Sequence, residues 1–365
     1  MLERIVRAIG RSGRARRRSR PALPALLALG IVAACQSASP NALVPAPTAL
    51  RASDPAGAGA AATPAPSAAP PQQVTLAVPA KSLAYLPYFL GLARGMYAAE
   101  GIDLQIQVMP SNLAVAAMTA GELAYTGSSG SSIQAAVSGQ PFKVVLIMVK
   151  DLAFTLVAAP DVASAADLRG KSVAITSISA SDDYALRAIL RGQGVPEDEV
   201  TAVAAQGTAN SFAALSSGAV QGAMLSPPFD VQAESLGFHP LASAADYLRR
   251  AQSGLATTDR QLATRPDEVR RMIRATLRSI DATLDDARDS TEFIASEFGV
   301  APDLAPGTYE KIARVLSRDG AATPELVRGE IEDAKARLGL GDDVPIAQVV
   351  DFAPLEQAQR ELGLR

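Results

Sequence analysis

Cysteine and histidine are almost absent from this chain of 365 residues, which contains one of each, Cys35 and His239. With no second cysteine there is no disulfide to form, so the fold must be stabilised by its core alone. A single histidine excludes a His-rich metal site. It also gives little basis for a Ser-His-Asp triad, because His239 precedes Pro240 in what we expect to be a surface turn. We therefore expect no metal, no cofactor and no catalytic residues.

The first 34 residues have the order of a signal peptide. Eight arginines stand against one acid, Glu3, and an apolar stretch then runs from Pro21 to Ala34. This stretch is shorter than the roughly 20 residues that a membrane-spanning helix needs. Its end, Val-Ala-Ala-Cys35, resembles the bacterial lipobox, whose cysteine receives diacylglycerol before cleavage. The alternative is an ordinary cleavage site followed by a free cysteine.

A lipid on Cys35 would anchor the chain at the extracytoplasmic face of the cell membrane or in the periplasm. Residues 35–71 consist mostly of Ala, Pro, Ser, Thr and Gly and include no aromatic residue, which predicts a flexible tether. The leader holds eight of the 34 basic and one of the 37 acidic residues, so its removal leaves 26 and 36, a net charge of −10. Because phosphate binding needs clustered Lys and Arg, we expect no nucleic-acid partner.

From Val74 onward, short apolar runs alternate with amphipathic stretches. A strand over residues 74–78 is followed by a predicted helix from Pro87 to Glu100, and a second series of strands and helices begins at Ser172. The remainder, from Pro266 to the end, predicts several amphipathic helices. This alternation is typical of an α/β architecture with mainly parallel sheets.

The length, roughly 290 residues after the tether, favours two lobes with separate cores. Two apolar extended stretches, residues 155–159 and 254–257, bracket the second series, and we interpret them as the crossings between the lobes. Lobe one would then comprise residues 74–158 and 257–365, with the C-terminal helices as an extension, and lobe two residues 159–256.

Several stretches, in this order and spacing, carry a resemblance to a known family. They are YFLGLARGMYAAEGIDL (88–104), AGELAYTG (120–127), DLRGKSVAI (167–175) and SPPF (226–229). The chain resembles the periplasmic-type solute-binding family of nitrate, sulfonate, taurine and thiamine-pyrimidine-precursor importers. The resemblance implies a type II periplasmic-binding-protein fold, in which two α/β lobes joined by two hinge strands close on one small solute. It also implies an ABC permease and its ATPase subunit as partners, and we expect a monomer.

Ligands of open parallel sheets gather at the carboxyl ends of the strands, so the loops after the predicted strands are the expected site. Aromatic side chains there are expected to be apolar walls or plain core, and the serines either donate to a ligand or cap helices. In lobe one the candidates are Ser82, Tyr85, Ser111, Asn112, Thr126, Gly127, Ser128 and Ser129. In lobe two they are Ser179, Ser181, Asp183, Tyr184, Gln206, Ser226, Pro227 and Phe229.

The charge of the solute stays open. Asp182 and Asp183 stand in the first turn of a lobe-two helix, whose N-cap we expect to be Ser181, and they already satisfy the positive helix end. A sulfonate- or nitrate-like anion and a pyrimidine-like base are therefore both possible. Lys81 is the one cation expected near the cleft, unless it is a solvated loop lysine. Two other classes remain: an enzyme on the same fold, which the leader argues against, and an envelope lipoprotein without a transport role.

Overall fold

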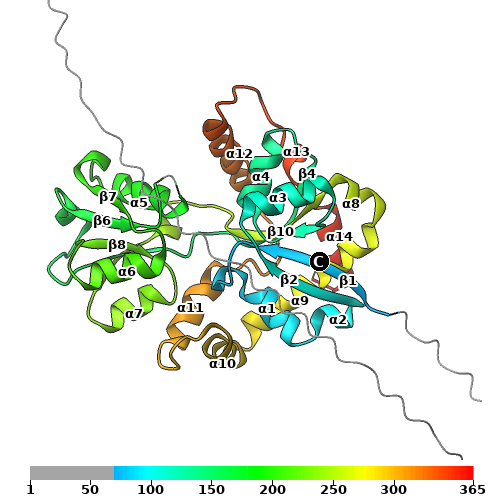
Figure 1. Cartoon of the computed structure of the whole chain (residues 1–365), viewed down its shortest axis with the longest axis horizontal. Coiled ribbons are helices and arrows are strands. Elements are labelled where there is room, and N and C mark those ends of the chain that lie inside the picture. Colours follow the sequence, from blue (N-terminus) through cyan, green and yellow to red (C-terminus); the bar gives the residue numbers. More distant parts are fainter. Residues whose placement is uncertain (1–69, 179, 365) are drawn as a thin grey trace, which may run out of the picture. The chain divides into compact units, whose positions relative to one another are not determined.

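The computed structural model describes residues 70–178 and 180–364. The predicted signal peptide, the lipidation site Cys35 and almost all of the tether lie outside these residues, as does the candidate Ser179. Among the described residues, no helix combines the length and the apolar character that a membrane span requires. The described chain forms two five-stranded sheets, each with its own helices and core (Figure 1).

The first sheet, which defines lobe one, has the strand order β2-β1-β3-β10-β4. Strand β1 pairs in parallel with β2 and β3, whereas β10 runs antiparallel to both β3 and β4. The carboxyl ends of β1, β2 and β3 therefore meet at one edge of the sheet. The strands are β1 (Gln72–Val78), β2 (Ile102–Val108), β3 (Tyr125–Thr126), β4 (Phe142–Val149) and β10 (Ser253–Thr258).

Helices before and after these strands cover the first sheet. The predicted helix from Pro87 to Glu100 is interrupted, because Gly95 adopts a left-handed φ of 69° that ends one helix and starts a short second one. Gly91 lets the first of these helices approach α9 (Pro266–Asp285) closely, since a Cβ at this position would lie 1.8 Å from Ser279 Oγ. The helices of this part are α1 (Leu86–Ala93), α2 (Met96–Ala99), α3 (Ser111–Ala120) and α4 (Ser129–Val137).

The second sheet, which defines lobe two, has the order β7-β6-β8-β5-β9. Strands β6, β7 and β8 are parallel and each is followed by a helix, while β5 runs antiparallel to β8 and β9. His239, expected in a surface turn, is exposed but begins the edge strand β9. The elements are β5 (Thr155–Ala158), β6 (Ser172–Ile175), α5 (Ser181–Gly192), β7 (Thr201–Ala204), α6 (Thr208–Ser216), β8 (Gly222–Leu225), α7 (Phe229–Ser235) and β9 (His239–Ser243).

The chain after β10 is helical, as its amphipathic pattern predicts. Pro at the first turn starts α9, α11, α12 and α14, where its missing N–H costs no hydrogen bond. Buried residues of α9, α10, α11 and α14 share one core with β1 and β4, so this extension belongs to lobe one. The helices are α8 (Asp259–Thr264), α9 (Pro266–Asp285), α10 (Ala287–Phe298), α11 (Ala305–Val315), α12 (Pro324–Leu338), α13 (Ile346–Val349) and α14 (Ala353–Glu361).

The connections between the lobes differ from the predicted crossings. The stretch at residues 155–159 supplies β5 of the second sheet, and the stretch at 254–257 lies in β10 of the first sheet. The chain therefore passes between the sheets at residues 150–154 and 244–252. The reason is that an apolar, extended sequence fits a buried strand as well as it fits a crossing.

Candidate functional site

The candidate residues of lobe one follow β1, β2 and β3, at the edge where these parallel strands end. Three hydroxyls form a chain there: Ser111 Oγ lies 3.1 Å from Ser128 Oγ, which lies 3.3 Å from Ser131 Oγ. Ser128 is the N-cap residue of α4, but its side chain makes no capping hydrogen bond. These hydroxyls therefore pair with one another at the start of the helix and not with its backbone N–H groups. Asn112, one residue further on in α3, is exposed.

The side chains of two other candidates of lobe one, Tyr85 and Thr126, are buried in the protein interior. Thr126 Oγ1 donates to the carbonyl of Ala77 at 3.2 Å and accepts the N–H of Ser128 at 3.3 Å, which shapes the loop itself. Tyr85 packs under Gly127, where an added Cβ would lie 3.1 Å from its ring. Burial raises the pKa of the Tyr85 hydroxyl.

Ser129 Oγ is fully buried and has no hydrogen-bond partner among the described residues. It lies against β10, since a Cβ on Gly254 would be 2.6 Å from this oxygen. A hydroxyl in this position faces a strand and not an open cavity.

Asp182 and Asp183 of lobe two lie in the first turn of α5, and both interact with other residues of this lobe. Ser181 is the first residue of α5 and Ala180 is its N-cap, one residue earlier than predicted. The reason is Asp182, whose carboxylate accepts the N–H of Thr176 and, at 2.8 Å, its hydroxyl, which ties the helix start to the end of β6. Burial raises the pKa of Asp182, against these hydrogen bonds, which lower it. Asp183 is buried and pairs with Arg187 at 3.0 Å.

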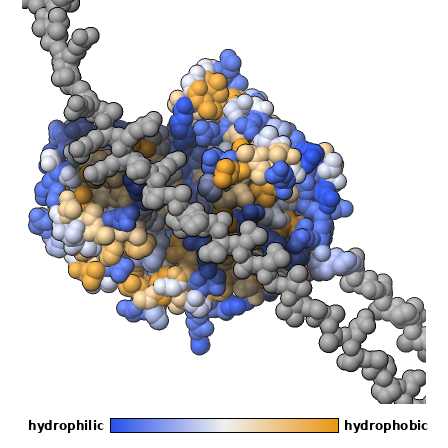
Figure 2. Space-filling model, in the orientation of Figure 1, coloured by the Kyte–Doolittle hydropathy of each residue, from blue (hydrophilic) through white to orange (hydrophobic). Residues whose placement is uncertain are grey.

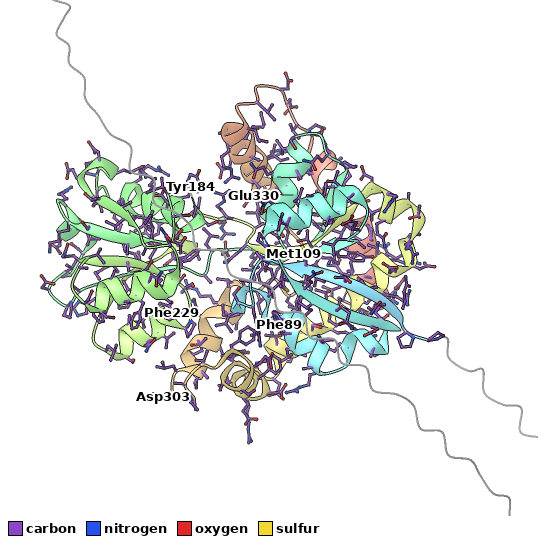
Figure 3. The ribbon with its side chains drawn as sticks, in the orientation of Figure 1. Phe89, Met109, Tyr184, Phe229, Asp303 and Glu330 are labelled. Atoms are coloured by element: carbon purple, nitrogen blue, oxygen red, sulfur yellow. The ribbon has the colours of Figure 1, made fainter. Side chains whose placement is uncertain are left out.

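Tyr184 was expected to wall the pocket, and it contacts two arginines. The guanidinium of Arg250 lies 5.5 Å from the centre of its ring and that of Arg337, in α12, lies 5.9 Å away. Arg250 is buried and also pairs with Glu330 of α12 at 3.3 Å. Tyr184 and Glu330 are labelled in Figure 3, on the second lobe and on α12. Tyr184 thus joins lobe two to a helix of lobe one.

A pocket of about 520 Å³ brings loops of both lobes together. Four candidates line it: Ser82 after β1, and Ser226, Pro227 and Phe229 after β8. This volume lies within the range of roughly 300–1,000 Å³ that small-molecule sites occupy. The remaining lining residues are Lys81, Leu83, Thr208, Pro228, Gln232, Phe298, Gly299, Val300, Ala301 and Leu304.

Residues 298–304, which comprise the last residue of α10 and the loop before α11, form a part of this pocket that the sequence did not predict. The pattern predicts this region only as amphipathic helix, and no motif marks it as a site. Gln232 was missed because it lies one turn into α7, beyond the loop. Thr208 stands in the predicted loop after β7, whereas the candidate of that loop, Gln206, is exposed and does not line the pocket.

The pocket offers aromatic rings and neutral polar groups. The rings of Phe229 and Phe298 line it, and Ser226 Oγ lies 3.5 Å from Thr208 Oγ1. Its one cation, Lys81, is already engaged: its Nζ lies 2.5 Å from Glu297 Oε1 and 5.7 Å from the centre of the Phe298 ring. No uncompensated charge is therefore presented to a solute by the lining residues.

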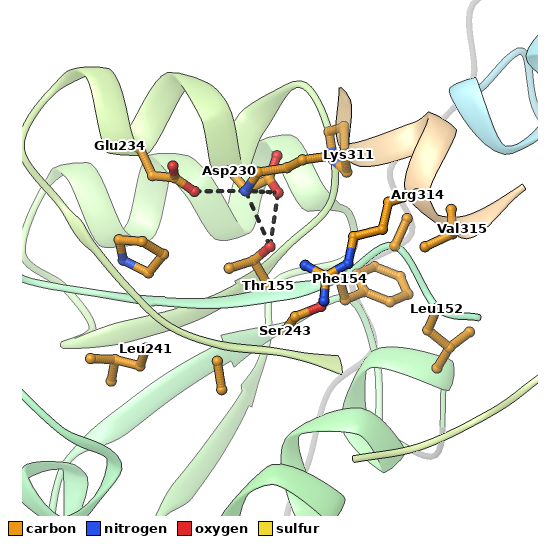
Figure 4. A pocket seen from close by; sticks show the side chains of 14 residues that line it. Leu152, Phe154, Thr155, Asp230, Glu234, Leu241, Ser243, Lys311, Arg314 and Val315 are labelled. Carbon is orange, nitrogen blue, oxygen red and sulfur yellow. Dashed lines mark hydrogen bonds and ion pairs between the residues drawn. The ribbon is translucent and has the colours of Figure 1, made fainter. Parts of the chain in front are cut away.

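A second cavity, of about 300 Å³, lies beside the interlobe connections (Figure 4). Leu152 and Phe154 of the first connection line it, together with Lys311 and Arg314 of α11 and residues of β9. Pro227 lines this cavity and the larger pocket alike. The described residues include no cluster of three or more His, Cys, Asp or Glu side chains that could hold a metal ion.

Two α/β lobes with a pocket between them define the fold class, which is the type II periplasmic-binding-protein fold. The chain belongs to the NMT1/THI5-like family, whose model matches residues 83–290. The predicted resemblance and fold class are thereby confirmed.

The names of individual relatives state different ligands or activities. The riboflavin-binding protein RibY of Chloroflexus aurantiacus is 31% identical over 278 residues, which cover 72% of this chain and 75% of that protein. The putative periplasmic sulfonate-binding protein SsuA of Methylobacillus flagellatus has a similar structure, with a TM-score of 0.66 at 16% identity over 81% of this chain and 97% of its own. The desulfurization enzyme DSZB also has a similar structure, with a TM-score of 0.60 at 14% identity over 80% of this chain and 99% of its own. The fold alone thus accommodates binding proteins and an enzyme.

Proposed function

We propose that this chain is the extracytoplasmic solute-binding component of an ABC importer, and that it captures a flat, uncharged heterocyclic solute in the pocket of about 520 Å³ between its lobes. The observation that carries the proposal is that residues of both lobes line this one pocket. A hinge motion would open and close such a pocket, and closure would present the loaded protein to a permease. The anchor would be lipid on Cys35, with residues 35–71 as the tether.

The lining residues favour a neutral, aromatic solute over an anion. Phe229 and Phe298 supply ring faces, while Ser82, Ser226 and Gln232 supply uncharged donors and acceptors. Lys81 is paired with Glu297, so the charge that it offers to an anion is partly offset by that carboxylate. The riboflavin-binding relative supports the same class of solute. A flavin-like ring system is accordingly our first choice, and an alkanesulfonate is the rival.

Twelve of the candidate residues divide into three proposed roles. We assign Ser82, Ser226, Pro227 and Phe229 to solute contact, and the hydroxyls of Ser111 and Ser128 to a polar rim on lobe one. Six further candidates support the loops that carry the contacts. They are Tyr85, Thr126, Gly127, Ser129, Asp183 and Tyr184.

Equilibrium titration distinguishes the two classes of solute. We expect riboflavin to bind the full chain, seen as a change in its fluorescence, and an alkanesulfonate not to compete with it. Phe229→Leu should weaken binding by ~0.5–1.5 kcal/mol, the typical value of an aromatic pair beyond its buried area, and Phe229→Tyr should not. Phe293→Leu is the matched control, since Phe293 packs on Phe298 at 6.4 Å but does not line the pocket. Binding of the sulfonate alone would refute the proposed solute class.

The anchor is tested separately. Cys35→Ser should release the protein from the membrane fraction, and labelled acyl chains should be incorporated only when Cys35 is present. Because Cys35 is the only cysteine, no other thiol can take its place. An unchanged membrane fraction for Cys35→Ser would contradict the anchor and leave the solute proposal intact.

A further inference from the structure

One lysine of lobe one enters a group of polar side chains of lobe two. Lys311 lies on α11, and its Nζ donates to Asp230 Oδ2 at 2.7 Å and to Glu234 Oε1 at 2.6 Å, both on α7. It also lies 3.4 Å from Thr155 Oγ1 on β5. Figure 4 shows the ammonium group between these three acceptors. Since α11 shares the core of lobe one, this cluster joins the two lobes.

The cluster is built around a carboxylate that has no access to water. Asp230 is fully buried; its Oδ2 also accepts the Thr155 hydroxyl at 2.9 Å, and its Oδ1 accepts the N–H of Val231 at 2.8 Å. Burial raises the pKa of Asp230, and the charge of Lys311 opposes that rise. Moving Lys311 away would leave a buried carboxylate without its counter-charge, which is strongly unfavourable.

The two helices joined by this cluster are those that lead out of the pocket walls. The wall formed by residues 298–304 runs directly into α11, and the wall formed by residues 226–229 runs directly into α7. The helices also approach each other at Gly307 of α11, which has no side chain: a Cβ there would lie 3.1 Å from Val231 Cγ1. The distance between α11 and α7 therefore controls the distance between the walls.

We propose that Lys311, with Asp230, Glu234 and Thr155, is an interlobe latch that positions Phe229 against the loop before α11. Lys311 lines the second cavity, of about 300 Å³, and not the pocket of about 520 Å³. It therefore acts as a positioning residue without touching the solute. The inference rests on the proposed role of the larger pocket in solute binding. It adds that affinity depends on a charged contact outside that pocket.

The latch is tested first without any solute. Reporter cysteines at the exposed positions Ala116 in α3 and Ala213 in α6, in the full chain carrying Cys35→Ser, place one spin label on each lobe. We expect Lys311→Met to increase the mean distance between the two labels and to broaden its distribution, as measured by double electron–electron resonance. An unchanged distribution in a folded Lys311→Met protein would overturn the latch, whatever solute the pocket takes.

The matched control lies one turn further along α11. Arg314 also reaches lobe two, pairing with Asp246 at 3.1 Å, but both side chains are largely exposed. Exposed pairs contribute little, so Arg314→Gln should leave the distance distribution unchanged. A distribution as broad for Arg314→Gln as for Lys311→Met would show a general effect of charge loss and would overturn the specific role of Lys311.

The second readout is affinity for riboflavin. Lys311→Met should weaken binding about tenfold through the altered interlobe equilibrium, whereas Arg314→Gln should bind as the wild type does. If riboflavin does not bind the wild type, the proposed solute class fails, and the distance measurement still decides the latch.

Two further variants cover the case in which Lys311→Met does not fold. Lys311→Met combined with Asp230→Asn removes the buried charge together with its partner, and we expect it to fold and to retain the broadened distribution. Gly307→Val instead separates α11 from α7 by bulk and leaves every charge in place; it should lengthen the interlobe distance. A wild-type distribution in both variants would refute the proposal.

Discussion

Replacing Ser129 by alanine should stabilise this protein, although the sequence marks Ser129 as a candidate for solute contact. Its hydroxyl is fully buried and has no hydrogen-bond partner among the described residues. Leaving a buried polar group unpaired costs ~1–3 kcal/mol. Against this gain stands the small void left by one oxygen, of order 1 kcal/mol. The expected net gain in the free energy of unfolding is about 1 kcal/mol, or roughly 2 °C in Tm for a domain of this size.

Ser132→Ala is the matched control, three residues along the same helix. Ser132 is equally buried, but its hydroxyl donates to the carbonyl of Ser128 at 2.9 Å. Losing that bond should lower the free energy of unfolding by ~0.5–1.5 kcal/mol. The same chemical change should therefore have opposite signs at the two positions in urea and thermal unfolding followed by circular dichroism.

Two results would refute this reasoning. If Ser129→Ala destabilised the protein as much as Ser132→Ala, the Ser129 hydroxyl would have a partner in solution. If Ser129→Ala left stability unchanged but weakened riboflavin binding tenfold or more, that partner would be the solute. The supporting role that we propose for Ser129 would then be wrong.

Two further predictions concern stability. Gly91→Ala should destabilise by ~1–3 kcal/mol, because its Cβ would overlap Ser279 of α9, and adding Ser279→Gly should restore much of the loss; a wild-type Tm for Gly91→Ala would contradict the tight contact. The loss of stability caused by Glu197→Gln should depend on pH. Burial alone would raise the pKa of Glu197, but its hydrogen bonds and ion pairs with Arg187 and Arg191 hold it below the usual 4.5. A lowered folded pKa means that the carboxylate stabilises the fold above pH 4.5 and ceases to do so as the pH falls through that lowered value. At pH 7 the variant should therefore lose at most ~1 kcal/mol in urea unfolding, and this difference should vanish in acid; a difference that persists at pH 2 would contradict the ion pairs as its cause.

The loops that carry the site could be predicted because they depend on local pattern. Strands β1, β2 and β3 and strands β6, β7 and β8 alternate with helices, and parallel strands place the loops after them at a common edge. Ser82, Ser226, Pro227 and Phe229 stand in such loops, and all four line the interlobe pocket. The described residues visible in Figure 2 present a mixture of hydrophilic and hydrophobic side chains.

Which side of a loop a residue faces could not be predicted in the same way. Tyr85 and Tyr184 both follow predicted strands, yet Tyr85 packs under Gly127 and Tyr184 stacks with Arg250 and Arg337. The partners of Tyr184 stand 66 and 153 positions later in the chain. No periodicity within a window of one helix or strand can connect such residues.

Two α/β lobes followed by helices could be predicted from the amino-acid sequence, because strand and helix periods are local properties of the chain. The family could be predicted as well, through motifs between residues 88 and 229, which lie within the range that the family model matches. Three contacts became visible only in the folded chain: residues 298–304 form a pocket wall, Glu297 pairs with Lys81, and Lys311 of one lobe pairs with Asp230 of the other. Each of these contacts joins segments far apart in the chain, and the packing of whole helices and sheets selects such pairs.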